Sequence, residues 1–490
     1  MVLSVNTLLV KSTAVQVAAS LVANWGMLNT GMAMGFPSVL VPPLVGTGPG
    51  LHTSLKEASW IASITYIPAL ISSLLAGPMI DWVGRRWGLM LMNLTFAISW
   101  ILLAVFPFSL LAVYSGRAVA GMGIGLACAS VSYTAEIGTV SLRTILVNFN
   151  PTLKALGIFL VYLWACFYED SWTETSYFGL GLTIIPILLT PLMPESPLWL
   201  LSRGRSEEAL QALQNLRGAS DPEQVKEELD SFSSRASDKQ QTTSWLSVFY
   251  NLRQPQAYKS LIFMLTFAIA GHLSGATIVM NYAINFTQKA GLGGEAYYVA
   301  LVVSSMRLVS SFLSTWACSR WGMRPPALLS SVVMVVSLLM LALSVSSLLT
   351  FPPWLVGFLV LLYVLTSNVA YSSIFWAVMG EVFPTSVRGV ANGIATSFGY
   401  FVTFLAIKFY TLLERSFSSL QLFLFFAGSG TVGTLLLFFF LPETRGKTLL
   451  EIEDYFKGTS ESVVSSKTNM DTASKENQIK ESYIFTLPGK

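Results

Sequence analysis

The sequence predicts an all-α membrane protein of two similar halves, each with six membrane-spanning helices. Of its 490 residues, 53% are apolar and 11% are charged, which is too little polar surface to coat a soluble globule. Many apolar runs also reach the roughly 20 residues that a helix needs to cross about 30 Å of hydrocarbon. The length of these runs excludes a large soluble enzyme with buried helices.

The two halves are visible as an internal repeat of charged motifs. Glu136 and Arg143 stand seven residues apart in the first half. Glu381 and Arg388 have the same spacing in the second half, offset by 245 residues (381 minus 136), which is half of the 490-residue chain. Two further pairs recur at nearly this offset: Pro194-Glu195-Ser196-Pro197 with Pro442-Glu443-Thr444-Arg445, and Gly84 with Gly322. Charged motifs that recur in the same order indicate a duplication.

Twelve apolar runs are expected to span the membrane. Those of the first half cover about 15–43, 58–79, 88–107, 109–135, 146–168 and 177–193. Those of the second half cover about 259–286, 296–318, 327–349, 354–379, 390–411 and 420–441. The first run has no cleavage site, so we expect an anchor rather than a signal peptide.

Alternation of these spans assigns each loop to one side of the membrane. If the N-terminus is cytosolic, the basic residues near the ends of the spans all fall inside: Arg85, Arg86, Arg143, Arg203, Arg205, Arg320, Arg324, Arg388, Arg445 and Lys447. The opposite loops carry mainly acidic residues: Glu57, Glu169, Asp170, Glu174 and Glu295. This positive-inside bias predicts a multi-pass protein of the cell membrane with both termini cytosolic.

Two regions are expected to lie outside the membrane. Residues 198–256 carry charges of both signs and a serine-rich run, which predicts a cytosolic linker with short amphipathic helices. This linker joins the N-terminal half (1–197) to the C-terminal half (257–456). The tail (457–490) is rich in Ser, Thr, Lys and Glu without apolar periodicity, which predicts disorder.

Residue usage gives no indication of catalysis or of a bound cofactor. Cys128, Cys166 and Cys318 lie in or beside apolar runs without framework spacing, so neither a disulfide nor a metal site is expected. The chain has two histidines, His52 and His272, and no nucleophile–base constellation, so we expect neither an enzyme nor a cofactor. The net charge of +3 does not indicate binding to nucleic acid.

Six motifs occur in order along the chain. They are Asp81-x-x-Gly84-Arg85-Arg86, Gly116-Arg117 followed by Gly121, Gly123 and Gly125, Tyr133-x-x-Glu136, Pro194-Glu195-Ser196-Pro197-x-Trp199-Leu200, Glu381-x-Phe383-Pro384-x-x-x-Arg388-Gly389 and Pro442-Glu443-Thr444-Arg445-Gly446. Over roughly residues 15–456 the pattern resembles the sugar porters of the major facilitator superfamily, and among them the insect facilitated trehalose transporters. The resemblance implies the major facilitator fold and alternating access by two rocking six-helix bundles.

The repeated carboxylates and guanidinium groups are expected to form a cytosolic latch. Glu136 or Glu381 cannot share a helical turn with an arginine seven residues on, so each is expected to reach a neighbouring loop. Bidentate arginine–carboxylate pairs are directional and strong, and they would have to separate when the cytosolic side opens. The second half has Ser319 in place of Asp81, so the latch should be unequal. The expected gating residues are Asp81, Arg85, Arg86, Arg117, Glu136, Arg143, Glu195, Arg320, Glu381, Arg388 and Glu443. The alternative is a pure topology signal, which requires no glutamates.

The resemblance also implies a solute cavity between the halves. Sugar porters line theirs with amides and aromatic rings, because hydroxyl groups need both donors and acceptors. Here the amide in the fifth span aligns with Pro151, and the seventh-span motif reads Gly271-His272-Leu273-Ser274-Gly275. The side chains expected to contact the solute are Lys154, His272, Ser274, Thr277, Asn281, Tyr282, Arg307, Trp376 and Tyr400.

Two of these side chains are charges within apolar spans. Lys154 lies about ten residues, or roughly 15 Å, into the fifth span, and Arg307 lies midway down the eighth, where the family has an amide. A charge at bilayer depth costs about 2.5–3.5 kcal/mol, so both are expected to face a wet cavity or a partner. The alternative is snorkelling to the membrane surface. His272 is either a hydrogen-bonded core residue or a cavity residue.

Two functions remain open from the sequence. The first is facilitative transport of a sugar, trehalose or a hexose, without proton coupling. The first span reads Gly35-Phe36-Pro37-Ser38 where proton-coupled sugar porters have an aspartate, and Glu57 is the first acidic residue of the chain. The second is transport or sensing of an anionic small solute, favoured by the cavity cations. The expected partners are a small solute and the lipid bilayer; the oligomeric state stays open, a monomer included.

Overall fold

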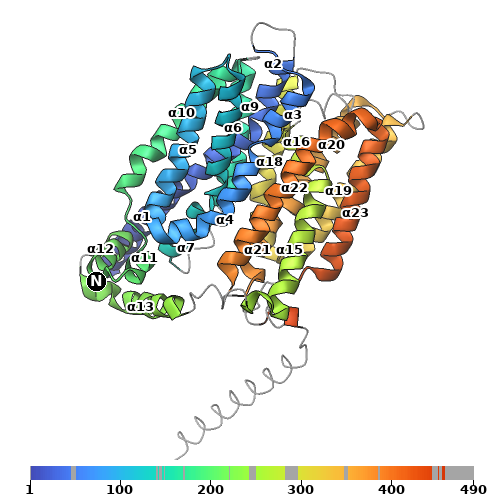
Figure 1. Ribbon diagram of the computed structural model, residues 1–490. Helices are drawn as coiled ribbons and strands as arrows, with labels where there is room; N and C mark the ends of the chain where they lie inside the picture. The colour runs from blue at the N-terminus through green and yellow to red at the C-terminus, as the bar shows by residue number, and fades with distance from the viewer. Residues whose placement is uncertain are drawn as a thin grey trace, which may run out of the picture.

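The computed structural model describes residues 2–45, 51–139, 142, 146–147, 149–168, 171–219, 221–241, 250–281, 296–346, 351–384, 387–443, 451 and 455–457. All regular secondary structure in these ranges is helical. Figure 1 shows two bundles of helices side by side, the N-terminal bundle coloured blue to green and the C-terminal bundle yellow-green to red. Arg143, Tyr282 and the tail from 458 lie outside the described residues, so the predictions made for them have no structural counterpart here.

Each predicted span of the N-terminal half is a helix or two consecutive helices. In order, the spans are α1 (Val2–Gly35) with α2 (Pro37–Val45), α3 (Leu55–Ser63) with α4 (Tyr66–Val83), α5 (Arg85–Val105), α6 (Leu110–Gly125) with α7 (Cys128–Ile137), α9 (Phe149–Phe167), and α10 (Trp172–Leu189) with the 3-10 helix η1 (Thr190–Leu192). Local sequence explains where some of them begin. Ser54 and Glu57 form a capping box at the start of α3, and Ser109 caps α6.

The C-terminal half repeats this arrangement. Its helices are α15 (Pro255–Leu273), α16 (Ala276–Asn281), α18 (Ala296–Trp321), α19 (Arg324–Val345), α20 (Pro353–Ser367), the π-helix η3 (Asn368–Ser373), α21 (Ile374–Val382), α22 (Arg388–Ser416) and α23 (Ser419–Phe440). Proline occupies one of the first two positions of α15, α19 and α20, where its missing N–H costs no helical hydrogen bond.

Eleven helical segments of the described chain are long and apolar enough to cross a membrane. They coincide with eleven of the twelve predicted spans to within a few residues. The twelfth, predicted at 259–286, is described only as far as residue 281. Within it α15 ends at Leu273 and Gly275 takes a φ of +88°, a conformation that favours glycine, before α16 begins. The Tyr363 hydroxyl donates a hydrogen bond to the Ser274 carbonyl at 3.0 Å and so satisfies an acceptor exposed by this break.

Short helices follow the N-terminal bundle and pack on one of its ends. They are α11 (Pro197–Ser202), α12 (Ser206–Arg217), the 3-10 helix η2 (Pro222–Val225) and α13 (Lys226–Gln241). Buried Ala209, Leu213 and Leu216 have the spacing of one helical face, as in an amphipathic helix. Arg217 binds Glu228 at 2.6 Å and donates to the carbonyl of Ile137 at 2.9 Å, which fixes the linker to the end of α7. Figure 1 shows these helices beside the N-terminus.

The two halves contact each other through α4 and α22 and through α9 and α18. Ser397 of α22 donates a hydrogen bond to the Leu70 carbonyl of α4 at 2.8 Å. Near the other end of α22, the Lys408 ammonium donates to Ser59 of α3 at 2.8 Å and lies 3.9 Å from the ring centroid of Trp60. These contacts bring the inner faces of both bundles together around a central space.

Candidate functional site

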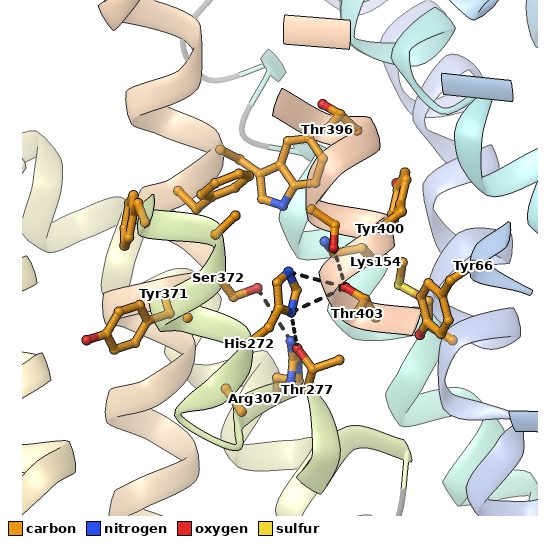
Figure 2. Close-up of a pocket in the computed structure, with 18 residues that line it drawn as sticks. Tyr66, Lys154, His272, Thr277, Arg307, Tyr371, Ser372, Thr396, Tyr400 and Thr403 are labelled. Atoms are coloured by element: carbon orange, nitrogen blue, oxygen red, sulfur yellow. Dashed lines mark hydrogen bonds between the residues drawn. The ribbon is translucent and has the colours of Figure 1, made fainter. Parts of the chain in front are cut away.

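A cavity lies between the two halves and is lined by both (Figure 2). The N-terminal half contributes Met34, Tyr66 and Lys154, and the rest of the lining comes from α15, α16, α18, η3, α21 and α22. Six of the nine side chains predicted to contact a solute line this cavity: Lys154, His272, Thr277, Arg307, Trp376 and Tyr400. The side chains of Asn281 and Tyr282 lie outside the described residues.

Ser274 has a different environment from the one predicted. Its side chain is fully buried and its hydroxyl donates a hydrogen bond to the Gly271 carbonyl at 2.8 Å. It is not among the residues that line the cavity. Ser274 stands at the break between α15 and α16, so its hydroxyl satisfies a backbone acceptor there.

Lys154 reaches the cavity because α9 packs very closely on α1. A Cβ atom on Gly31 would overlap the Lys154 carbonyl oxygen, and one on Gly157 would overlap the Leu28 carbonyl oxygen. Small residues allow such close approach of helices in membranes. The Lys154 ammonium lies 5.3 Å from the ring centroid of Trp376, a cation–π contact that joins the two halves.

Arg307 is held on the inner side of α18 by the π-helical segment η3. Its Nη2 donates a long hydrogen bond to the Ser372 hydroxyl at 3.4 Å, and Asn368 donates to the Arg307 carbonyl at 3.3 Å. A π-helical turn inserts an extra residue, and such turns occur frequently at functional sites. In Figure 2, Ser372 lies toward the cavity, whereas the Tyr371 hydroxyl points away from it and donates to the Gly430 carbonyl at 3.3 Å.

His272 occupies the centre of the cavity wall in Figure 2. Its Nδ1 lies 2.7 Å from the Thr277 hydroxyl, and its Nε2 lies 3.2 Å from the Thr403 hydroxyl. The break at Gly275 allows Thr277 to turn back toward His272, five residues earlier in the sequence. The ring therefore links α15, α16 and α22 while one edge stays on the cavity.

Aromatic rings form much of the remaining wall. Tyr66 of the N-terminal half and Tyr400 of the C-terminal half lie with ring centroids 6.4 Å apart, and Phe375 packs edge-to-face on Trp376 at 5.7 Å. Sequence reasoning missed Tyr66, Ser372, Phe375 and nine other members of the lining. The cavity face of α22 could have been predicted from the sequence, because Thr396, Gly399, Tyr400 and Thr403 follow the i, i+3, i+4, i+7 spacing of one helical face.

The charges around this cavity are of one sign. Lys154 comes from the N-terminal half and Arg307 from the C-terminal half, and within the described residues no aspartate or glutamate lines the cavity. Among the described residues, the contacts of the two cationic groups are to the Trp376 ring and the Ser372 hydroxyl, neither of which carries a negative charge.

The predicted gating residues of the first half meet at the ends of α4, α5 and α7. Arg85 binds Glu136 through both Nε and Nη2, with Nη2–Oε1 at 2.9 Å, and binds Asp81 at 2.8 Å. The side chains of Arg85 and Glu136 are 5% and 14% exposed, so this pair is largely shielded from solvent. Glu136 also accepts a hydrogen bond from the Ser196 hydroxyl. All four residues belong to the N-terminal half.

Glu195 caps the start of α5. Its carboxylate accepts hydrogen bonds from the backbone N–H groups of Arg85 at 3.0 Å, Arg86 at 3.1 Å and Ser196 at 2.9 Å. Burial raises the pKa of Glu195 above its usual value, and the N–H donors act in the opposite direction. Gly84, with φ of +109°, lies against this carboxylate, where a Cβ would be 2.6 Å from Oε2.

The second half has the same helix cap, with a methionine in the place of Arg85. Glu443 accepts from the backbone N–H groups of Met323 at 3.2 Å and Arg324 at 3.3 Å, beside Gly322 with φ of +87°. Methionine 323 stands in this loop where Arg85 stands in the first. Arg388 donates to the Phe383 carbonyl at 3.2 Å. Arg320 lies in the last turn of α18 and Glu381 near the end of α21.

Two other predicted gating residues bind backbone carbonyls. Arg86 donates to the Met193 carbonyl at 3.2 Å. Arg117 is 1% exposed within α6, where it donates to the carbonyls of Ala33 at 2.7 Å and Ile61 at 3.3 Å. Arg117 therefore joins α6 to α1 and α3, apart from the ion pairs at Arg85.

Comparisons with known proteins agree with this architecture. A family model described as "Sugar (and other) transporter" matches residues 7–456. The facilitated trehalose transporter Tret1 of Bombyx mori is 27% identical over 447 residues, covering 89% of this chain and 86% of that protein. The protein of the same name from Polypedilum vanderplanki is 28% identical over 457 residues, covering 90% and 88%.

Solved structures of the xylose transporter XylE share the fold. XylE bound to 6-bromo-6-deoxy-D-glucose gives a TM-score of 0.72 at 20% identity, covering 91% of this chain and 100% of that one. The inward-open conformation of XylE from E. coli also gives 0.72 at 20% identity, covering 89% and 99%. Because the family model spans nearly the whole chain, this protein belongs to the sugar (and other) transporter family, with the major facilitator fold.

Proposed function

We propose that this protein is a facilitative transporter, a uniporter, that moves a sugar across the cell membrane by alternating access. The observation that carries the proposal is the cavity between the halves, which combines aromatic rings with threonine and tyrosine hydroxyls. Aromatic faces pack against sugar rings, and hydroxyl groups can both donate to and accept from a sugar. The names of the relatives make trehalose the first candidate and a hexose the second.

Rocking of the two halves about this cavity would expose it to each side in turn. Tyr66 and Lys154 belong to one half, and His272 and Arg307 to the other, so a bound solute contacts both moving bodies. A solute that binds both halves lowers the free energy of the closed arrangement relative to the open ones. The cavity therefore supplies the differential binding that alternating access requires.

Uniport is supported by the lack of an acidic residue in the first span and by the position of Glu57. The first span, Ser12–Val45, contains no aspartate or glutamate. Glu57, the first acidic residue, lies at the start of α3, where its carboxylate accepts from the Ser54 N–H at 2.8 Å in a capping box. A carboxylate used as a helix cap does not stand at mid-membrane depth to load and unload a proton.

The proposed orientation has both termini in the cytosol. The basic residues at the α4–α5 junction and the charged helices α12 and α13 support a cytosolic position for this end of the molecule. Large apolar side chains exposed on the outer faces of the bundles support contact with the lipid bilayer; examples are Leu75 (61%), Leu188 (67%) and Phe439 (63%).

Uptake into proteoliposomes tests the proposed function. Purified full-length protein is expected to equilibrate radiolabelled trehalose or glucose across the membrane at a saturable rate, while L-glucose enters no faster than into protein-free vesicles. If the protein gives no saturable uptake of either trehalose or glucose, the proposal is wrong. The cavity cations favour a second candidate, an anionic solute, and their arrangement carries the inference that follows.

A further inference from the structure

The strongest unexplained feature of the cavity is its pair of cations. A charged group withdrawn from water is costly unless a counter-charge or a full set of hydrogen bonds compensates it. Arg307 has five N–H donors, and among the described residues one of them is paired, at 3.4 Å, with an uncharged hydroxyl. Lys154 has three donors and rests on the face of an aromatic ring. These groups retain donors for a further acceptor.

The two cations also approach one short stretch of the chain. Arg307 binds Ser372 and Lys154 lies over Trp376, four residues further along the same helical segment. Residues four apart on a helix lie about 5–6 Å from each other on one face. Both cationic groups therefore approach the cavity side of the η3–α21 junction, within one helical turn of each other.

We propose that Lys154 and Arg307 form a two-cation site that binds the carboxylate of an acidic sugar, such as a uronic acid. The guanidinium fork matches a carboxylate in bidentate geometry, and the ammonium adds a second charge from the opposite half. The hydroxyls and rings of Tyr66, Tyr400 and Thr403 remain for the neutral part of the sugar. This inference rests on the proposed function and narrows its substrate class.

The site also gives the carboxylate a role in the transport cycle. Lys154 and Arg307 are on opposite halves, so their like charges repel when the halves close around the cavity. A carboxylate between them converts this repulsion into two attractions. An acidic sugar therefore stabilises the closed arrangement more than a neutral sugar of the same shape.

Thermal unfolding of the purified full-length protein in detergent measures this preference directly, because a ligand that binds the folded state raises the midpoint. The probes are glucose, trehalose, glucuronate, sodium acetate and inorganic phosphate. Glucuronate is expected to give a half-maximal shift at a concentration about tenfold lower than glucose. Acetate and phosphate, which lack the sugar ring, are expected to give no comparable shift at that concentration.

Four variants assign the preference to the two cations. Arg307→Gln and Lys154→Gln should each reduce the preference for glucuronate over glucose to about threefold or less, while Arg307→Lys should retain most of it. Arg205→Gln, at an exposed arginine of the linker, removes the same charge outside the cavity and should change nothing. The wild-type comparison stands on its own if a cavity variant fails to fold.

Three results would overturn the inference. Glucose or trehalose binding as tightly as glucuronate would do so and leave the proposed sugar transport intact. Equal stabilisation by acetate, phosphate and glucuronate would mean that the cations bind any small anion without a sugar. Stabilisation by none of the probes would exclude a sugar-acid site, and the separate uptake assay would then decide whether neutral sugars are transported.

Discussion

Trp376 is the residue at which the two halves and the cavity meet. Its ring centroid lies 5.3 Å from the Lys154 ammonium, and its ring packs against Phe375. Trp376→Ala removes a ring face available to a sugar and the cation–π partner of Lys154, so the KM for uptake should rise about tenfold. Trp316→Ala, at a tryptophan that is 50% exposed on α18, is the matched control and should leave KM unchanged. Equal KM values for the two variants would exclude Trp376 from the binding site.

At position 84 the backbone conformation and a neighbouring carboxylate both disfavour any residue other than glycine. The Gly84 φ of +109° is strained for an L-residue, and a Cβ would lie 2.6 Å from the Glu195 carboxylate. Gly84→Ala should therefore lower the stability of the protein by more than about 1 kcal/mol. Gly77→Ala provides the control, because a Cβ at this helical glycine meets nothing within 4 Å, so the helix should be unchanged or stabilised. Thermal unfolding in detergent measures both, and equal midpoints would refute this role for Gly84.

At the scale of helices, the Arg85–Glu136 pair joins α5 to α7 within one half. Rigid rocking of the halves would not have to break such a pair, so the structure gives it the geometry of a brace. Glu136→Gln leaves Arg85 buried without its main counter-charge and should destabilise the protein by about 3–5 kcal/mol. A loss of thermal stability with unchanged cysteine labelling from the cytosolic side is the result expected of a brace.

If the Arg85–Glu136 pair instead acts as the latch predicted from the sequence, Glu136→Gln should give a different result. A latch that holds the cytosolic side closed would shift the resting population by about 1–2 kcal/mol, or roughly 5- to 30-fold, when broken. Cytosolic labelling of a single cysteine placed at Thr396, in a background without the three native cysteines, measures this shift. A rise in labelling of this size would establish the latch and contradict the brace.

Lys408 is the clearest contact between helices of opposite halves. Its ammonium binds Ser59 at 2.8 Å and lies 3.9 Å from the Trp60 ring, at the end of α22 that the proposed orientation makes extracellular. Lys408→Gln should weaken closure on that side and raise external labelling of a cysteine at Thr403 about fivefold. Lys259→Gln, at an exposed position of α15, serves as the control. No difference between the two would show that Lys408 does not hold the halves together.

At the scale of the whole molecule, apolar length was sufficient to predict the spans, because a bilayer of fixed thickness demands it. The break at Gly275 and the π-helical turn at Asn368 could not be predicted, since both depend on contacts with other helices. The cost of a charge in hydrocarbon indicated that Lys154 and Arg307 need a wet cavity or a partner, and both line the cavity. Ser274 was also expected there but does not line the cavity, because at the break between α15 and α16 its hydroxyl binds the Gly271 carbonyl.

The central claim is that one cavity is exposed alternately to the two sides and carries sugar without proton coupling. Counterflow in proteoliposomes tests it most directly. Vesicles preloaded with unlabelled trehalose or glucose should accumulate the labelled sugar transiently, because only a site that returns loaded exchanges solute across the membrane. An imposed pH gradient should not change the final level. Absence of the transient, or lasting accumulation driven by the pH gradient, would contradict the account.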